Sequence, residues 1–116
     1  MSDFKLELLK MEAEYGYSKI VRITAIQGLS EWENDLGVIE TTQRIAINCR
    51  NVAWKSALRM LVHYSNRNPS VSKFIEMKAK NFNYWDAVHW YFIAAAIYLK
   101  SDDDDLWNIV KNGIVA

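Results

Sequence analysis

The hydrophobic pattern is densest at residues 84–99, which read YWDAVHWYFIAAAIYL. These sixteen residues contain no Gly or Pro, which predicts a helix rather than a strand. The apolar side chains go all the way round such a helix, as in a helix that is either buried or spans a membrane. A span needs about 20 apolar residues, but the uninterrupted run covers only Trp90 to Leu99. We therefore expect a buried central helix, capped by Asn83, and no membrane span.

The N-terminal segment has the spacing of an amphipathic helix over residues 3–15. Phe4, Leu8, Met11 and Tyr15 recur at helical intervals, with Leu9 beside them. We expect these side chains to form the apolar face, while three acidic side chains face water: Glu7, Glu12 and Glu14. Gly16 then suits the position after the last turn.

The pattern is ambiguous from residue 17 to residue 27. Ser18 can cap a helix ending at Gly28, yet the β-branched residues of this segment also suit a strand. No partner strand is visible and a lone strand is unstable, so we expect a helix. Ser30 and Glu33 form a capping box for a short helix over 31–36, which Gly37 would end.

Residues 38–64 contain no helix breaker and predict one long helix, with a possible kink or break at 48–51. A loop around Pro69 follows, and then a helix capped by Ser70 or Ser72 that ends near Lys80. A last helix, with Asp102–Asp105 in its first turn, would end at Gly113. The chain thus predicts an all-α fold, a compact single domain over 1–116 with six or seven helices around the central apolar helix 84–99.

Composition bears on the cellular location of the protein but does not indicate its function. Half of the 116 residues are hydrophobic, and the start of the chain lacks the apolar stretch of a signal peptide. Cys49 is the single cysteine, so no internal disulfide can form. These features favour a cytoplasmic location.

Charge is segregated along the chain although its formal sum is zero. Residues 1–40 carry −4, residues 41–80 carry +7 and residues 81–116 carry −3. A basic middle between acidic ends is typical of proteins that contact charged partners.

The clearest candidate contact surface is a polar stripe on the helix expected over 38–64. On a period of 3.6 residues, its members share one face: Arg44, Asn48, Asn51, Lys55 and Arg59. Arg and Asn donate hydrogen bonds to phosphate oxygens and base edges, and the same stripe suits an acidic protein. The alternative is that the stripe is only the solvated face of an amphipathic helix.

Aromatic residues form the second candidate surface. The chain has five Trp and six Tyr, more than a domain of this size buries easily, and these types dominate interface hot spots. Trp85 belongs to the part of the central helix expected to reach the surface. The alternative is a core role with the polar tip exposed.

Three features are compatible with chemistry but do not form a site. Asp102–Asp105 are successive residues, so on a helix they cannot converge on one cation, and helix-dipole stabilisation explains them better. Asp86 and His89 can meet at i and i+3, but too few further His or Cys are present for a zinc site. Cys49 is expected to be a small buried residue.

These observations favour a small non-enzymatic protein-binding module, with no catalytic residue, metal or cofactor. Inhibitors, immunity proteins, adaptors and small subunits all have this size and charge layout. The partner would be another protein or a second copy of the chain. The alternative is a nucleic-acid-binding accessory protein that uses the basic stripe, although overall neutrality weighs against it.

Overall fold

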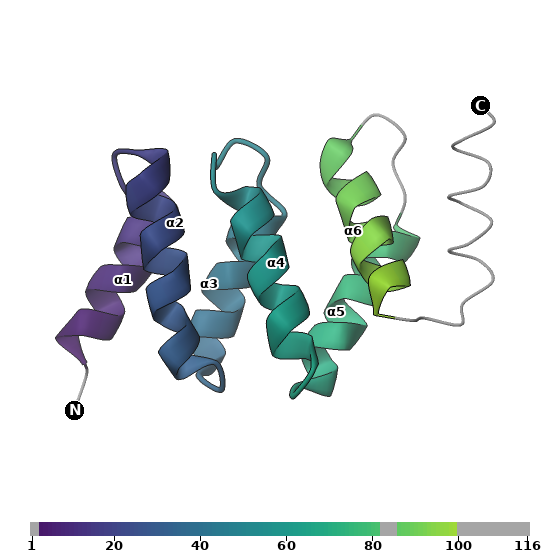
Figure 1. Cartoon of the computed structure of the whole chain (residues 1–116), viewed down its shortest axis with the longest axis horizontal. Coiled ribbons are helices and arrows are strands. Elements are labelled where there is room, and N and C mark those ends of the chain that lie inside the picture. Colours follow the sequence, from purple (N-terminus) through teal and green to yellow (C-terminus); the bar gives the residue numbers. More distant parts are fainter. Residues whose placement is uncertain (1–2, 82–85, 100–116) are drawn as a thin grey trace. The chain divides into compact units, whose positions relative to one another are not determined.

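A computed structural model describes residues 3–81 and 86–99, and every regular element within these ranges is helical (Figure 1). The predicted all-α class is confirmed. The elements in order are α1 (Phe4–Tyr15), α2 (Lys19–Gly28), η1 (Leu29–Trp32, a 3₁₀ turn), α3 (Leu36–Ala46), α4 (Trp54–Ser65), α5 (Pro69–Lys80) and α6 (Ala87–Tyr98). The chain divides into two units, Met1–Tyr64 and Ser65–Ala116, which are described separately. The single domain expected over 1–116 stays a prediction.

Side-chain caps fix where the helices of the first unit begin. Asp3 accepts hydrogen bonds from the backbone amides of Lys5 and Leu6 in α1, and Ser18 accepts one from the amide of Val21 in α2. Asp35 caps α3 in the same way, through the amide of Val38. Each cap satisfies an amide that has no partner within its helix. The helical prediction for 17–27 is confirmed by α2, which Ser18 caps and which buries Ala25 and Ile26.

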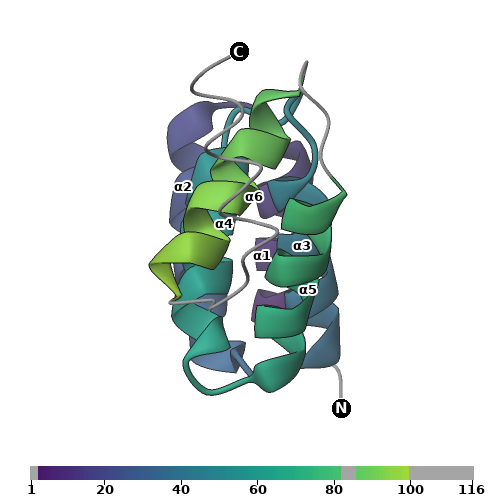
Figure 2. The same ribbon diagram turned by 90° about the vertical axis from the view of Figure 1, so that its right-hand side faces the viewer.

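The helices of the first unit form two layers. Figures 1 and 2 show α2 and α4 on one side of the unit and α1 and α3 on the other. The layers of α1 and α2 approach closely at Gly28, where an added Cβ would lie 3.3 Å from a methyl carbon of Leu9. The largest fully buried side chains of this unit are Tyr64, Ile26, Leu29, Ile45, Leu61, Val38 and Thr42.

The orientation expected for α1 is wrong. Its expected inner face is exposed, with Phe4 80% and Tyr15 76% accessible and Leu8 and Met11 also exposed. Leu6 and Ala13, on the opposite side of the helix, are the residues that α1 buries. Because α1 is apolar on two opposite faces, spacing alone could not tell which of them packs inward.

The short helix expected over 31–36 is also wrong. The turn there is a 3₁₀ helix that begins at Leu29, and α3 starts at Leu36. Gly37 lies in the first turn of α3 instead of ending a helix. Asp35 caps α3 and so fixes where this helix begins. The sequence pattern of a capping box at Ser30 and Glu33 had suggested an earlier helix start.

The long helix expected over 38–64 is two helices, α3 and α4, separated by residues 47–53. The break lies at the residues where a kink was considered. The Asn48 side chain accepts a hydrogen bond from the amide of Arg50, and the Asn51 side chain accepts one from the amide of Ala53. Such local side-chain bonds compete with helical hydrogen bonds, so two Asn in four residues end α3.

The second unit is a pair of helices, α5 and α6. Asn68 caps α5 and Pro69 takes its first position, where a missing amide hydrogen costs nothing. Phe74 of α5 meets Phe92 of α6 edge to face, with ring centres 5.9 Å apart. The apolar helix expected from residue 84 begins at Ala87, and Asp86 caps it. It buries five residues, Val88, Phe92, Ile93, Ala95 and Ala96.

Several expectations lie outside the described residues. They concern Asn83 as a cap, Trp85 as a surface residue and the last helix with Asp102–Asp105. Within 3–81 and 86–99, none of the helices has the length and apolar content needed to cross a bilayer.

Candidate functional site

Arg44, the first residue of the predicted stripe, already forms an ion pair within the chain. It lies in the last turn of α3, and its guanidinium binds both carboxylate oxygens of Glu14 from α1. The hydrogen bond to Glu14 raises the pKa of Arg44 above its usual value. A phosphate or an acidic partner would have to displace Glu14 from this two-point contact.

The two asparagines of the stripe hold the backbone of the 47–53 segment. Asn51 is 4% exposed, and its amide nitrogen donates to the carbonyl oxygen of Ala13 at 3.2 Å. Asn48 is exposed, and its side chain accepts from the amide of Arg50. Asn51 is therefore a structural residue, and the stripe does not form one face of one helix.

Lys55 and Arg59 share α4 but differ in their surroundings. The Lys55 ammonium lies 5.7 Å from the centre of the Trp54 ring, within range of a cation–π contact. Arg59 is exposed, and among the described residues it makes no hydrogen bond or ion pair. Arg59 also lines a cavity in the first unit.

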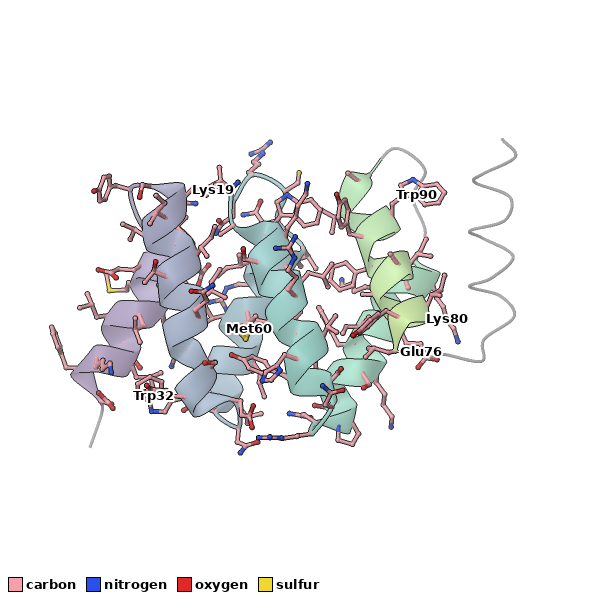
Figure 3. All side chains as sticks on the ribbon, viewed as in Figure 1. Lys19, Trp32, Met60, Glu76, Lys80 and Trp90 are labelled. Carbon is pink, nitrogen blue, oxygen red and sulfur yellow. The ribbon has the colours of Figure 1, made fainter. Side chains whose placement is uncertain are left out.

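The cavity is an open groove of about 320 Å³ in the first unit. We call it the α2–α4 groove, and its lining residues are Ile26, Gln27, Ser30, Ser56, Arg59, Met60 and His63. Figure 3 shows Met60 between the ribbons of α2 and α4. Ile26 is fully buried and forms an apolar floor with the half-buried Met60.

Sequence spacing explains the α4 wall of this groove. Ser56, Arg59, Met60 and His63 recur at intervals of three and four residues, so they share one face of the helix. The predicted stripe missed this face because it was centred on Arg44 and Asn48, which precede α4. The signal that could have found it is the i, i+4 pair of Arg59 and His63, two nitrogen donors on the face that also carries Met60.

The groove combines an apolar floor with hydrogen-bond donors. The Arg59 guanidinium, the His63 imidazole and the Ser56 hydroxyl all come from one wall. On the other wall the Ser30 hydroxyl is engaged, since it donates to the carbonyl of Gln27 at 2.7 Å. This arrangement suits an apolar side chain on the floor next to a carboxylate that accepts from Arg59.

Asp86 and His89 do not form a metal or catalytic site with other described residues. His89 Nδ1 lies 3.3 Å from Asp86 Oδ2, but the angles are not those of a hydrogen bond, so this nitrogen has no hydrogen-bond partner among the described residues. The Asp86 Oδ1 atom caps α6 instead. Within the described ranges no three His, Cys, Asp or Glu side chains are close enough to hold a metal ion.

Two other expectations change with the structure. Cys49 is exposed in the 47–53 segment, whereas a buried position was expected. The tryptophans divide between roles, since Trp54 is buried while Trp32 and Trp90, labelled in Figure 3, are half-buried. The Lys5 ammonium lies 5.8 Å from the centre of the Trp32 ring, within range of a cation–π contact.

Comparison with known proteins does not identify the chain. No protein-family model, no curated protein and no solved structure matches it.

Proposed function

We propose that the chain is a small non-enzymatic protein-binding module whose α2–α4 groove accepts an acidic amphipathic helix from another protein. The observation that carries the proposal is Arg59, an exposed guanidinium without an ion pair among the described residues, beside the apolar floor of Ile26 and Met60. A helix laid in a groove is bound by apolar anchors at spacing i, i+3, i+4 and by charges along the rim.

Charge complementarity selects the acidic partner. The basic block of the chain, residues 41–80 with a net charge of +7, contains Arg59 and His63 of the groove. The groove has no acidic residue among its described lining residues, so a basic partner would find no counter-charge there. Opposite charges at the rim speed association and favour the correct partner, while the buried apolar contacts supply most of the affinity.

The structure does not contain the continuous basic helix face on which the nucleic-acid alternative was based. It required Arg44, Lys55 and Arg59 on one continuous face, but Arg44 lies on α3 and pairs with Glu14. The 41–80 charge still makes salt-dependent binding worth measuring, with uniform weakening in Arg44→Ala, Lys55→Ala and Arg59→Ala as the expected result. We keep it as the second candidate.

A peptide-display selection from random sequences tests the leading proposal. Peptides of about five helical turns are selected on the immobilised wild-type chain, and single clones are then assayed on Arg59→Glu and Arg50→Glu. Arg50 is the matched control, because it is exposed but does not line the groove.

The proposal predicts enriched peptides that combine Asp or Glu with apolar residues at helical spacing. They should bind Arg59→Glu at least about tenfold more weakly and bind Arg50→Glu as the wild type. Failure to enrich any peptide, or enrichment of peptides that bind Arg59→Glu and the wild type equally, would refute the groove as the binding site.

A further inference from the structure

The exposed side of α1 carries a coiled-coil type of apolar seam. Phe4, Leu8, Met11 and Tyr15 are separated by four, three and four residues, which is the a/d spacing of a heptad. At 100° per residue they fall within an arc of about 60° on the helix. All four side chains are exposed, and we call this set the α1 seam.

The α1 seam is distinct from the face by which α1 packs in the first unit. Leu6 and Ala13, which are buried, lie on the side of the helix opposite Phe4. A helix that is apolar on two opposite faces is suited to lie between two layers. In the first unit α1 packs against α2, α3 and η1, so its outer face is unpartnered among the described residues.

We infer that the α1 seam binds the α1 seam of a second copy, in an antiparallel helix pair with twofold symmetry. A twofold interface requires a self-complementary surface, and a seam with large residues at both ends and smaller ones inside meets this condition. In the antiparallel register the Phe4 end of one seam faces the Tyr15 end of the other, and Leu8 faces Met11. This inference concerns a different surface from the groove and does not depend on it.

The exposed area is sufficient for a dimer. Phe4 and Tyr15 each present most of an aromatic side chain, and the whole seam offers on the order of 500 Å² per copy. Tyr17, 93% exposed just after α1, extends this surface. Complete burial of the seam on both copies would remove about 1,000 Å² from solvent, which is the lower bound for a specific interface.

The charges beside the seam select the antiparallel orientation. Lys5 and Glu12 flank one edge, and an antiparallel pair brings this edge against itself. Lys5, whose Nζ also lies 3.8 Å from Glu31 Oε2 in its own chain, then faces Glu12 of the second copy. A parallel pair would instead bring Glu7 against Glu12. On the other edge Glu7 is paired with Lys10 and Glu14 with Arg44, which reduces repulsion between the copies.

The association is measured by analytical ultracentrifugation of the wild type, Met11→Lys and Met77→Lys over about 1 to 100 μM, a range set by ordinary interface affinities. Met77 of α5 is the matched control, since Met11 and Met77 are 63% and 54% exposed on their helices. We expect a dimer for the wild type and Met77→Lys, and a dissociation constant raised at least about tenfold in Met11→Lys. Circular dichroism reports whether each variant keeps its helices.

A wild type that is monomeric throughout this range would overturn the inference. So would a dimer that Met11→Lys weakens no more than Met77→Lys does, because another surface would then hold the copies together. If Met11→Lys loses its helices, Leu8→Ala takes its place, since this exposed position on the same seam tolerates a strong helix former.

The orientation has its own test. Glu12→Lys should weaken the dimer by repelling Lys5 of the second copy, and the double variant Lys5→Glu, Glu12→Lys should restore it. Failure of the double variant to restore association would rule out the antiparallel arrangement.

Discussion

The Asn51 side chain donates a hydrogen bond to the carbonyl oxygen of Ala13, 3.2 Å away and 38 residues earlier in the chain. Its amide oxygen accepts from the amide of Ala53 at 2.9 Å, so one buried side chain connects the end of α1 to the start of α4. The last carbonyls of a helix have no partner within it, and Asn51 supplies one for α1.

We expect Asn51→Ala to lower the free energy of unfolding by about 2 to 3 kcal/mol, because it leaves a buried carbonyl and a buried amide unsatisfied. Urea denaturation followed by circular dichroism measures the change. Asn48→Ala is the control, since Asn48 is exposed and its loss should cost about 1 kcal/mol or less. Equal losses for the two variants would contradict the structural role of Asn51.

Tyr64 predicts a loss of stability at alkaline pH. The side chain is 1% exposed, and burial, with a smaller contribution from Glu33, raises the pKa of Tyr64 to about 12. In the unfolded chain the hydroxyl loses its proton near pH 10. The unfolded state thus binds fewer protons between pH 10 and pH 12, and stability falls as pH rises through this window, by about 2 to 3 kcal/mol.

Tyr64→Phe should remove this alkaline decline. At neutral pH it should leave stability unchanged or raise it by about 1 kcal/mol, because the Tyr64 hydroxyl has no hydrogen-bond partner among the described residues. Thermal unfolding at pH 7 and at pH 11 measures both effects. Tyr98→Phe, at an exposed position, controls for general tyrosine titration and should decline as the wild type does.

Two glycines should respond in opposite ways to alanine. A Cβ on Gly16 would lie 2.5 Å from the carbonyl oxygen of Glu12 and 2.8 Å from a methyl carbon of Val21, so Gly16→Ala should cost about 1 to 3 kcal/mol. A Cβ on Gly37 would lie 2.7 Å from Lys10 Nζ and 3.0 Å from Asp35 Oδ1, and both atoms are at the ends of side chains rather than in the backbone. Gly37→Ala, in the first turn of α3, should be neutral or stabilising by up to about 1 kcal/mol. Chemical denaturation of both variants should give this order, and the reverse order would show that Gly16 is not closely packed.

Arg44→Ala tests the division of the predicted stripe. The Arg44–Glu14 pair is largely exposed on the Arg44 side, so its loss should cost only about 0.5 to 1 kcal/mol. Because Arg44 does not line the groove, the variant should bind groove-selected peptides as the wild type does. Fluorescence anisotropy of a labelled peptide measures this, and a loss as large as that in Arg59→Glu would restore the single-stripe interpretation.

The sequence was informative about helices because capping residues act locally. Ser18 caps α2 with its own side chain, as its position in the sequence predicted. The expected cap of α5, Ser70 or Ser72, was wrong, because Asn68 caps this helix and Pro69 begins it. Such signals depend on neighbours a few residues away, so they do not require the tertiary contacts to be known. The break between α3 and α4 was recognisable for the same reason, from Asn48 and Asn51.

The sequence could not predict which face of a helix packs inward or which charged side chains form ion pairs, because both depend on residues far apart in the chain. The inner side of α1 is decided by its packing on α2, where Leu9 meets Gly28. The pairing of Arg44 with Glu14, 30 residues apart, removed one cation from the predicted stripe. The groove formed because α2 lies beside α4, which the stripe of a single helix could not indicate.

We propose the α2–α4 groove as the docking surface for an acidic helix. The most direct measurement is the change in backbone amide NMR signals of the wild-type chain on addition of the tightest acidic peptide from the display selection. If the peptide docks in the groove, the largest shifts fall on the polar residues that line it: Gln27, Ser30, Ser56, Arg59 and His63. Shifts confined to α1 or to α5 and α6, with these five unchanged, would contradict it.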